Sequence, residues 1–373
     1  MELTRNAFDV PDRYGRPCPV YDVFLCRFDQ TPFVTERFAM PPEYGREVLD
    51  GVYVCLIAPY YSRTALHDAE LMVDGAARKN GILLRCPFLM TYMMLWPMQS
   101  QDGATHAARL MKGQWSSSVI PLSFHGQPAK RRGRLAAATL TRYDGPYIVE
   151  WIEYHLLLGF QHFFVYTNHA PDMAARLEPF ERRGLVTRIA WDYPYEVYPC
   201  AMYPRFPRDS HLYTQPPQQV HALRAFGHLW DWIALFDADE FMVYPLNLSM
   251  ELILQEAEAA GHDCIEVTGR WFGTAGLREV PARVIESYTR CEEGCTCFPK
   301  PIVRPQAAQS ALVHWAPTAK PSWKIPSDRL RYNHYAALSD HKRRRGPEFD
   351  GLPNNACTDR LAIELRESRE NNA

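Results

Sequence analysis

The clearest pattern of apolar and polar positions lies between residues 135 and 236, where short apolar runs alternate with segments of helical spacing. Within residues 146–158 the spacing i, i+3, i+4, i+7 predicts a helix, and the positions concerned are Ile148, Trp151, Ile152 and His155. The other predicted elements are strands at 135–140, 162–166, 185–191 and 232–236 and helices at 171–183 and 220–228. Strands alternating with helices over short connections predict an α/β fold, with a mostly parallel sheet and helices on both faces.

Residues before 131 lack this alternation. The first 50 residues are rich in proline, and the run Gly51–Ile57 has the composition of a strand. Residues 66–77 and 81–84 fit either short strands or a brief helix. A polar stretch with a basic cluster at 130–134 separates this region from the α/β pattern. We therefore predict three parts: a smaller β-rich accessory domain at 1–130, an α/β domain at 131–350, and a tail at 351–373.

Composition narrows the classes of protein to consider. The 373 residues contain 41 Lys and Arg against 43 Asp and Glu, a net charge of −2, which argues against a dedicated nucleic-acid-binding protein. The hydrophobic fraction of 47% and the charged fraction of 23% are those of a folded globular chain. The most apolar run, Ile82–Trp96, is interrupted by Arg85 and Pro87, so we expect no membrane-spanning segment.

The ten cysteines do not form a recognisable metal motif. No Cys-x-x-Cys pair occurs, and the spacing of Cys291, Cys295 and Cys297 suits a tetrahedral zinc knuckle poorly. Disulfides within that loop and free thiols are both compatible with the sequence.

The segment Trp232–Phe241 carries the sharpest chemical signal, because acidic residues follow a buried strand at once. Ligands of open α/β sheets bind outside the carboxyl ends of the strands. In an extended segment, residues two apart point the same way, so Asp237 and Asp239 are expected to converge, while Glu240 points away as a supporting group. Converging carboxylates repel each other unless a cation lies between them. Mg²⁺ and Mn²⁺ suit such oxygen ligands and also bind phosphate. The structural alternative is that both aspartates only cap a turn.

Several segments, taken in order, resemble glycosyltransferase family 92, whose members carry a nucleotide-sugar transferase domain of the GT-A type. The resemblance covers roughly residues 135–350, and the matching segments are 144–155, 158–168, 237–241, 271–276, 300–305 with His314, and 332–346. It implies a GT-A-like sheet in the α/β domain. It also implies transfer of a sugar from a UDP-sugar, with UDP-galactose expected as donor, to a glycan hydroxyl with inversion.

The same resemblance assigns metal ligands and substrate contacts. Asp237 and Asp239 are expected to hold a divalent metal, Mn²⁺ first and Mg²⁺ second, with His314 completing its shell and His334 as the competing histidine. For the donor, the resemblance implies contacts from Arg142, Asp144, Asn168 and Asp237. Each of these residues also has a structural alternative; for Arg142 it is a solvated residue at a strand end.

On the acceptor side, the resemblance points to Trp271, whose ring suits stacking on a sugar, and Gly273, which lets the backbone approach. A tight turn after a strand is the alternative there. An inverting transfer needs a carboxylate that takes the proton of the acceptor hydroxyl. Glu286 is the candidate for this general base, with Glu279 and Asp263 nearby in the sequence. His155 lies on the apolar face of its helix and is interpreted as a core residue.

Two departures from the family pattern keep other functions open. Arg142-Tyr143-Asp144 replaces a Lys-Asn-Glu triplet, and Thr167 replaces an aspartate. A degenerate member that binds glycan without turnover is one alternative, and a metal-dependent phosphohydrolase is another. A homodimer is left open. No signal peptide or membrane segment is expected from the sequence. The resemblance implies the Golgi lumen or Golgi membrane for a eukaryotic chain, and the cytoplasm is the expectation otherwise.

Overall fold

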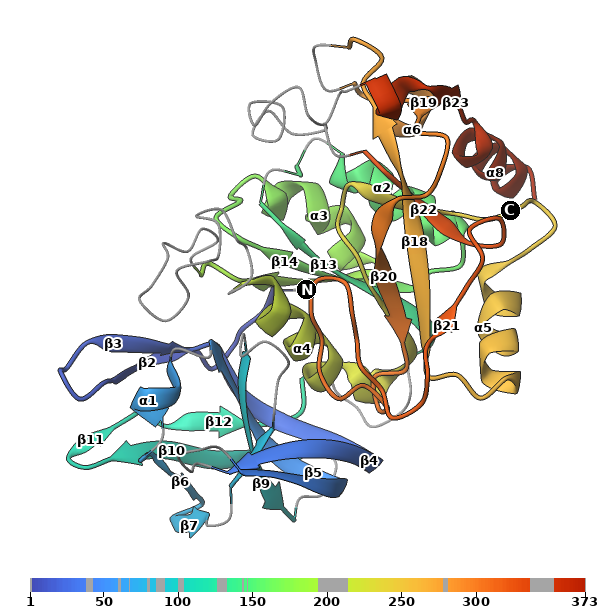
Figure 1. The fold of residues 1–373 in the computed structure, drawn as a ribbon. Coiled ribbons are helices and arrows are strands. Elements are labelled where there is room, and N and C mark those ends of the chain that lie inside the picture. Colours follow the sequence, from blue (N-terminus) through green and yellow to red (C-terminus); the bar gives the residue numbers. More distant parts are fainter. Residues whose placement is uncertain are drawn as a thin grey trace.

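The computed structural model describes residues 2–37, 43–59, 62–66, 68–78, 81–84, 91–99, 104–125, 133–142, 144–145, 147–193, 214–277, 281–335 and 352–372. It is a mixed α/β fold built on one large sheet, with a β-rich part formed by the preceding residues (Figure 1). The fold class predicted from the sequence is confirmed. The predicted boundary near residue 130 and residues 342–345 of the matching segment 332–346 lie outside the described residues.

The β-rich part contains a closed barrel. Its strands run in the order β4-β5-β9-β8, and all four pairings are antiparallel; they are β4 (Asp22–Arg37), β5 (Glu43–Pro59), β8 (Ile82–Leu84) and β9 (Thr91–Met98). A second small sheet comprises β6 (Glu70–Val73), β7 (Ala76–Arg78), β10 (His106–Lys112), β11 (Trp115–Ser116) and β12 (Ile120–Leu122). The hairpin β2 (Phe8–Pro11) and β3 (Pro17–Val20) and the short helix α1 (Arg63–Leu66) complete this part.

The large sheet has a parallel half and an antiparallel half. The parallel half has the order β1-β15-β14-β13-β16, and its strands are β1 (Glu2–Leu3), β13 (Gly133–Thr141), β14 (His162–Thr167), β15 (Val186–Ala190) and β16 (Trp230–Leu235). From β16 the sheet continues antiparallel through β20, β18, β19 and β23. Three further strands pair beside this order: β21 and β22 pair with β18, and β17 pairs with β22. The strands of this half are β17 (Glu240–Val243), β18 (Cys264–Gly273), β19 (Arg290–Cys291), β20 (Cys297–Val303), β21 (Trp323–Lys324), β22 (Arg331–His334) and β23 (Cys357–Thr358).

Burial on both faces explains the continuous apolar runs of the parallel strands. In β13, Leu135 and Ala137 pack into one core, and Ala136 and Ala138 pack into another. The first core takes in α2 (Ile148–Leu157), α3 (Met173–Arg182), α5 (Met250–Ala259) and α8 (Leu361–Glu370). The second takes in α4 (Gln215–Ala225) and the turn η4 (Gly227–Leu229). The short helices α6 (Val284–Ser287) and η6 (Leu352–Asn355) lie toward the antiparallel edge (Figure 1).

His155 is the core residue that the sequence predicts. Its ring is fully buried, its Nδ1 donates to the carbonyl of Trp151 over 2.7 Å, and its Nε2 accepts from the amide of Met242 over 3.1 Å. Burial lowers the pKa of His155 to about 3. The imidazole is therefore neutral and joins α2 to β17.

The β-rich part and the large sheet share a core. Helix α4 lies between them (Figure 1), and its Val220 and Leu223 pack in one cluster with Phe24 of the barrel and Phe164 of β14. In addition, β1 pairs with β15, so the strand nearest the start of the chain extends the large sheet. Within the described residues no helix is long and apolar enough to span a membrane.

Candidate functional site

The acidic segment after β16 forms a turn rather than an extended strand. The amide of Glu240 donates to the carbonyl of Asp237 over 3.1 Å, and the carboxylate of Glu240 in return accepts from the amide of Asp237 over 2.9 Å. The expectation that Glu240 points away is therefore wrong, because the turn ends the strand alternation. Asp239 and Glu240 are buried, whereas the Asp237 side chain is 30% exposed.

A lysine from the antiparallel half of the sheet enters this acidic cluster. Lys300 of β20 places its ammonium 2.7 Å from Asp237 Oδ2 and 3.4 Å from Glu240 Oε1. The other oxygen of Asp237 accepts from the side-chain amide of Gln215, the first residue of α4, over 2.6 Å. Both carboxylate oxygens of Asp237 thus have partners from the chain itself.

The electrostatics follow from this burial. Burial raises the pKa of Glu240 to about 7, with Lys300 opposing the rise and Asp237 adding to it. For Lys300, burial alone would lower the pKa, but the carboxylates of Asp237 and Glu240 raise it above the ordinary lysine value. Lys300 therefore stays charged, and it balances part of the negative charge of the turn.

His334 is the histidine that the fold brings to Asp239. Strand β22 pairs with β17 so that His334 stands opposite Glu240, and with β18 so that it stands beside Trp271. Its Nε2 lies 3.6 Å from Asp239 Oδ2. Its ring stacks on Trp271, with centroids 4.3 Å apart and planes 21° from parallel. Trp271 and His334 thus form one wall beside the acidic turn.

His314, the expected metal ligand, lies among aromatic rings. It belongs to the tight turn in which Leu312 and Trp315 exchange backbone hydrogen bonds. Its ring is 5.2 Å from that of Phe298 and 6.1 Å from that of Trp315. The geometry therefore favours His334 over His314 as the histidine that accompanies Asp239.

The three other residues expected at the donor follow neighbouring parallel strands. Arg142 and Asp144 come after β13, Asn168 comes after β14, and Asp237 comes after β16, so all four lie beyond the same carboxyl edge of the sheet. Asp144 accepts from the amide of Arg142 over 3.1 Å and from the hydroxyl of Tyr147. The fold thus places the predicted donor residues along one edge.

Asn168 also has a clear structural role. It is fully buried, and its amide nitrogen donates to the carbonyls of Trp191 and Tyr193 over 2.7 and 2.8 Å. These bonds hold the segment after β15 against the end of β14. Its side-chain oxygen has no hydrogen-bond partner within the part of the chain that the structure describes.

The acceptor-side residues are placed by local packing. A Cβ on Gly273 would come 2.5 Å from the side-chain oxygen of Asn355 in η6, so the close backbone approach seen here is to Asn355. Glu286 lies on α6, where its carboxylate pairs with Arg366 of α8 over 2.7 Å. Asp263 pairs with Lys320 over 3.1 Å, and Glu279 lies outside the described residues.

Sequence reasoning assigned no role to Lys300 or Gln215. A lysine in the otherwise apolar segment of β20 was the available signal for the first, because a buried lysine requires a carboxylate partner. No sequence signal pointed to Gln215, whose role depends on how α4 packs against the edge of the sheet.

The side chains of the acidic turn are in part suited to ligate a divalent metal ion. Asp239 offers a buried carboxylate and His334 an imidazole nitrogen beside it, a combination of oxygen and nitrogen ligands that a divalent metal can take. Asp237 is bound to Lys300 and Gln215, so it would have to share or exchange these partners to ligate a metal.

Comparison with known proteins shows which proteins this chain resembles. Residues 139–365 match the model of glycosyltransferase family 92. Proteins of that family name from Ricinus communis and Oryza sativa subsp. japonica are 25% identical over 194 residues and 23% identical over 292 residues, which is 51% and 72% of this chain. One from Arabidopsis thaliana is 23% identical over 189 residues, 48% of the chain. The alignments cover 32%, 46% and 30% of these relatives, so the chain spans less than half of their length.

Proposed function

Because the chain belongs to glycosyltransferase family 92, we propose that it transfers a sugar from a nucleotide-sugar donor to a glycan hydroxyl. The donor in this proposal is UDP-galactose, the metal is Mn²⁺, with Mg²⁺ as the alternative, and the transfer inverts the anomeric centre. The observation that carries it is the turn Asp237–Glu240 at the carboxyl end of β16, with His334 3.6 Å from Asp239.

In this proposal Asp239 and His334 hold the metal, and Asp237 joins them or keeps Lys300 in place. When bound, the metal supplies positive charge for the diphosphate that leaves with the nucleotide. Lys300 contributes a second positive charge that is fixed before substrate binds, because Asp237 and Glu240 hold its ammonium. A charge that is already oriented needs no reorganisation during the reaction.

The substrate contacts proposed are those that the edge of the sheet provides. Arg142, Asp144 and Asn168 lie at the same carboxyl edge of the sheet as Asp237. They are proposed to line the binding site of the nucleotide. The ring of Trp271, partly exposed beside His334, is proposed to contact the acceptor sugar. Glu286 is proposed to take the proton of the attacking hydroxyl, which an inverting displacement requires.

The deciding experiment is a screen of UDP-sugars with Mn²⁺ that measures release of UDP, with and without glycan acceptors. We expect UDP-galactose to give the highest rate and Asp239→Asn to lower that rate by about 100-fold or more. Asp328→Asn, which changes an exposed carboxylate, is the matched control and keeps the full rate. Full activity in Asp239→Asn would exclude the metal assignment.

Calorimetry separates turnover from mere glycan binding. A transferase binds UDP in the presence of Mn²⁺, whereas a degenerate glycan-binding member shows heat with glycan and none with UDP. The phosphohydrolase alternative would instead release free phosphate from simple esters.

A further inference from the structure

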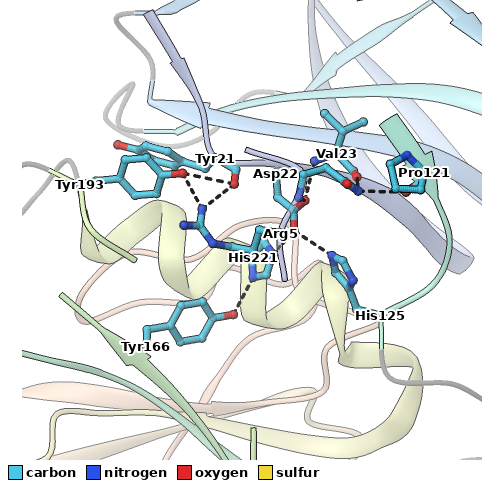
Figure 2. Close-up of polar contacts among 10 residues, drawn as sticks. Arg5, Tyr21, Asp22, Val23, Pro121, His125, Tyr166, Tyr193 and His221 are labelled. Atoms are coloured by element: carbon cyan, nitrogen blue, oxygen red, sulfur yellow. Dashed lines mark hydrogen bonds and ion pairs between the residues drawn. The ribbon is translucent and has the colours of Figure 1, made fainter. Parts of the chain in front are cut away.

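A second cluster of ligand-type side chains lies where the barrel meets α4. Asp22 opens β4, His125 follows β12, and His221 lies in α4. Figure 2 shows Asp22 between the two imidazoles, with Tyr166 on the far side of His221. Asp22 and His221 are completely buried, and His125 is 7% exposed. The three side chains therefore come from both parts of the molecule and meet inside it.

The carboxylate of Asp22 is oriented by the backbone. Its Oδ1 accepts from the amides of Asn6 and Val23, each over 2.8 Å. Its Oδ2 points between the histidines, 2.7 Å from His125 Nε2 and 2.9 Å from His221 Nε2. One oxygen thus fixes the carboxylate, and the other is presented to the two rings.

The histidines are oriented so that their Nε2 atoms converge. The outer nitrogen of His221, Nδ1, lies 2.6 Å from the hydroxyl of Tyr166 on β14. Phe24 packs against both imidazoles, with ring centroids 5.1 and 5.2 Å away. Oδ2 and the two Nε2 atoms all lie within 4.8 Å of one another. A hydrogen-bonding group on the outer nitrogen of a histidine is the usual support for one that ligates a metal.

A cation at this place would take over the compensation of Asp22 Oδ2 that the two imidazoles provide in its absence. A carboxylate removed from water is costly unless a charge or several donors compensate it. The nearby Arg5 directs its guanidinium elsewhere: it donates to the carbonyl of Tyr21 and the hydroxyl of Tyr193 and lies over the ring of Trp191 (Figure 2). Two imidazoles and one carboxylate are a donor set that zinc prefers, since zinc takes nitrogen and oxygen ligands in a small shell.

We propose that Asp22, His125 and His221 bind one divalent cation of the zinc class, and that this ion ties the β-rich part to α4. Its ligands are Asp22 Oδ2 and the Nε2 atoms of both histidines, and water completes the shell. Ligands of a tetrahedral zinc ion stand roughly 3.3 Å apart, so the rings move about half an ångström away from Oδ2. The site differs in kind from the Asp239 site, because imidazole nitrogen dominates it.

Metal analysis of the purified full chain tests the proposal. After exposure to Zn²⁺ and gel filtration, we expect about one tightly held zinc per chain in the wild type and in Asp239→Asn. We expect none in His125→Gln or His221→Gln, while the matched control His169→Gln, an exposed histidine, keeps its zinc. Co²⁺ in place of Zn²⁺ should give the visible absorption of a low-coordinate cobalt ion, and this absorption should disappear in His125→Gln.

Tyr166→Phe keeps the test decisive if the histidine variants fail to fold. It removes only the hydroxyl that supports His221, and we expect it to weaken zinc binding by about 10- to 100-fold in competition with a chromogenic chelator. Zinc-free wild-type protein whose melting temperature is the same with and without Zn²⁺ would overturn the proposal, and the cluster would then be a hydrogen-bond network alone. Because zinc content is measured without any sugar donor, this outcome is independent of transferase activity.

Discussion

The ammonium of Lys300 lies 2.7 Å from the carboxylate of Asp237, so the first aspartate of the acidic turn already faces a cation that belongs to the chain. The two residues come from different halves of the sheet, Lys300 from antiparallel β20 and Asp237 from the end of parallel β16. Their contact therefore depends on the junction between these halves, where β16 pairs with β20.

Replacing this lysine should destabilise the protein. Lys300→Met leaves Glu240 buried and Asp237 without its cation, and we expect a loss of about 3 kcal/mol in the free energy of unfolding measured with urea. Lys320→Met is the matched control, because Lys320 is 55% exposed and its partner Asp263 also has Arg304 within 3.8 Å; its cost should stay below about 1 kcal/mol. Equal losses in the two variants would mean that the buried pair contributes no more than a surface pair.

The two candidate histidines can be separated by substitution. His334→Ala removes the imidazole beside Asp239, and we expect it to weaken Mn²⁺-dependent UDP binding by about 10- to 100-fold in calorimetry. His314→Ala should leave that affinity unchanged, because its ring packs against Phe298 and Trp315. The reverse result would restore His314 as the metal ligand expected from the sequence.

The role of Glu286 has a kinetic test. If its carboxylate takes the acceptor proton, Glu286→Gln should lower kcat by about 100-fold or more. The fold should survive, because the ion pair of Glu286 with Arg366 is partly exposed and such pairs contribute little. Asp263→Asn serves as the comparison and should keep its rate. An unchanged kcat in Glu286→Gln, with a normal melting temperature, would remove this residue from the mechanism.

His155 should make stability depend on pH. In the folded protein its pKa is about 3, against an ordinary value of 6.5, so below pH 6.5 the unfolded chain binds a proton that the folded chain does not. Stability is then present in full above pH 6.5 and falls toward pH 3, by up to about 1.4 kcal/mol per pH unit. Urea unfolding at several pH values measures the slope of the free energy of unfolding against pH. His155→Gln should reduce this slope by the contribution of one proton, about 1.4 kcal/mol per pH unit, and His169→Gln should leave it unchanged. A slope that is the same in His155→Gln and in the wild type would show that another group is responsible.

The parallel half of the sheet could be predicted because its signal is local. Most of the strands from β13 to β16 contain a short run of consecutive apolar residues, as in residues 135–138 and 232–235, and α2 shows helical spacing, as at Ile148 and Trp151. Asp237 followed from the same logic, since its place after an apolar strand fixed the edge of the sheet at which it lies.

The rest of the site depends on contacts between distant segments. The orientation of Glu240 was mispredicted because a turn, not an extended strand, follows Phe236. The register of β22 against β17 and β18 brings His334 to Asp239, and no local pattern near residue 334 encodes that register. His125 and His221 are likewise unremarkable in sequence, because their partner Asp22 is 103 and 199 residues away.

The pairing of β1 with β15 has a consequence for the order of synthesis. Glu2 and Leu3 are made before the barrel strands, and their partners Arg188 and Ile189 are made 186 residues later. Strand β1 therefore lacks its pairing strand β15 while the barrel residues are being translated. An unpaired strand can pair with other chains, so β1 is open to such misassembly until residue 189 emerges.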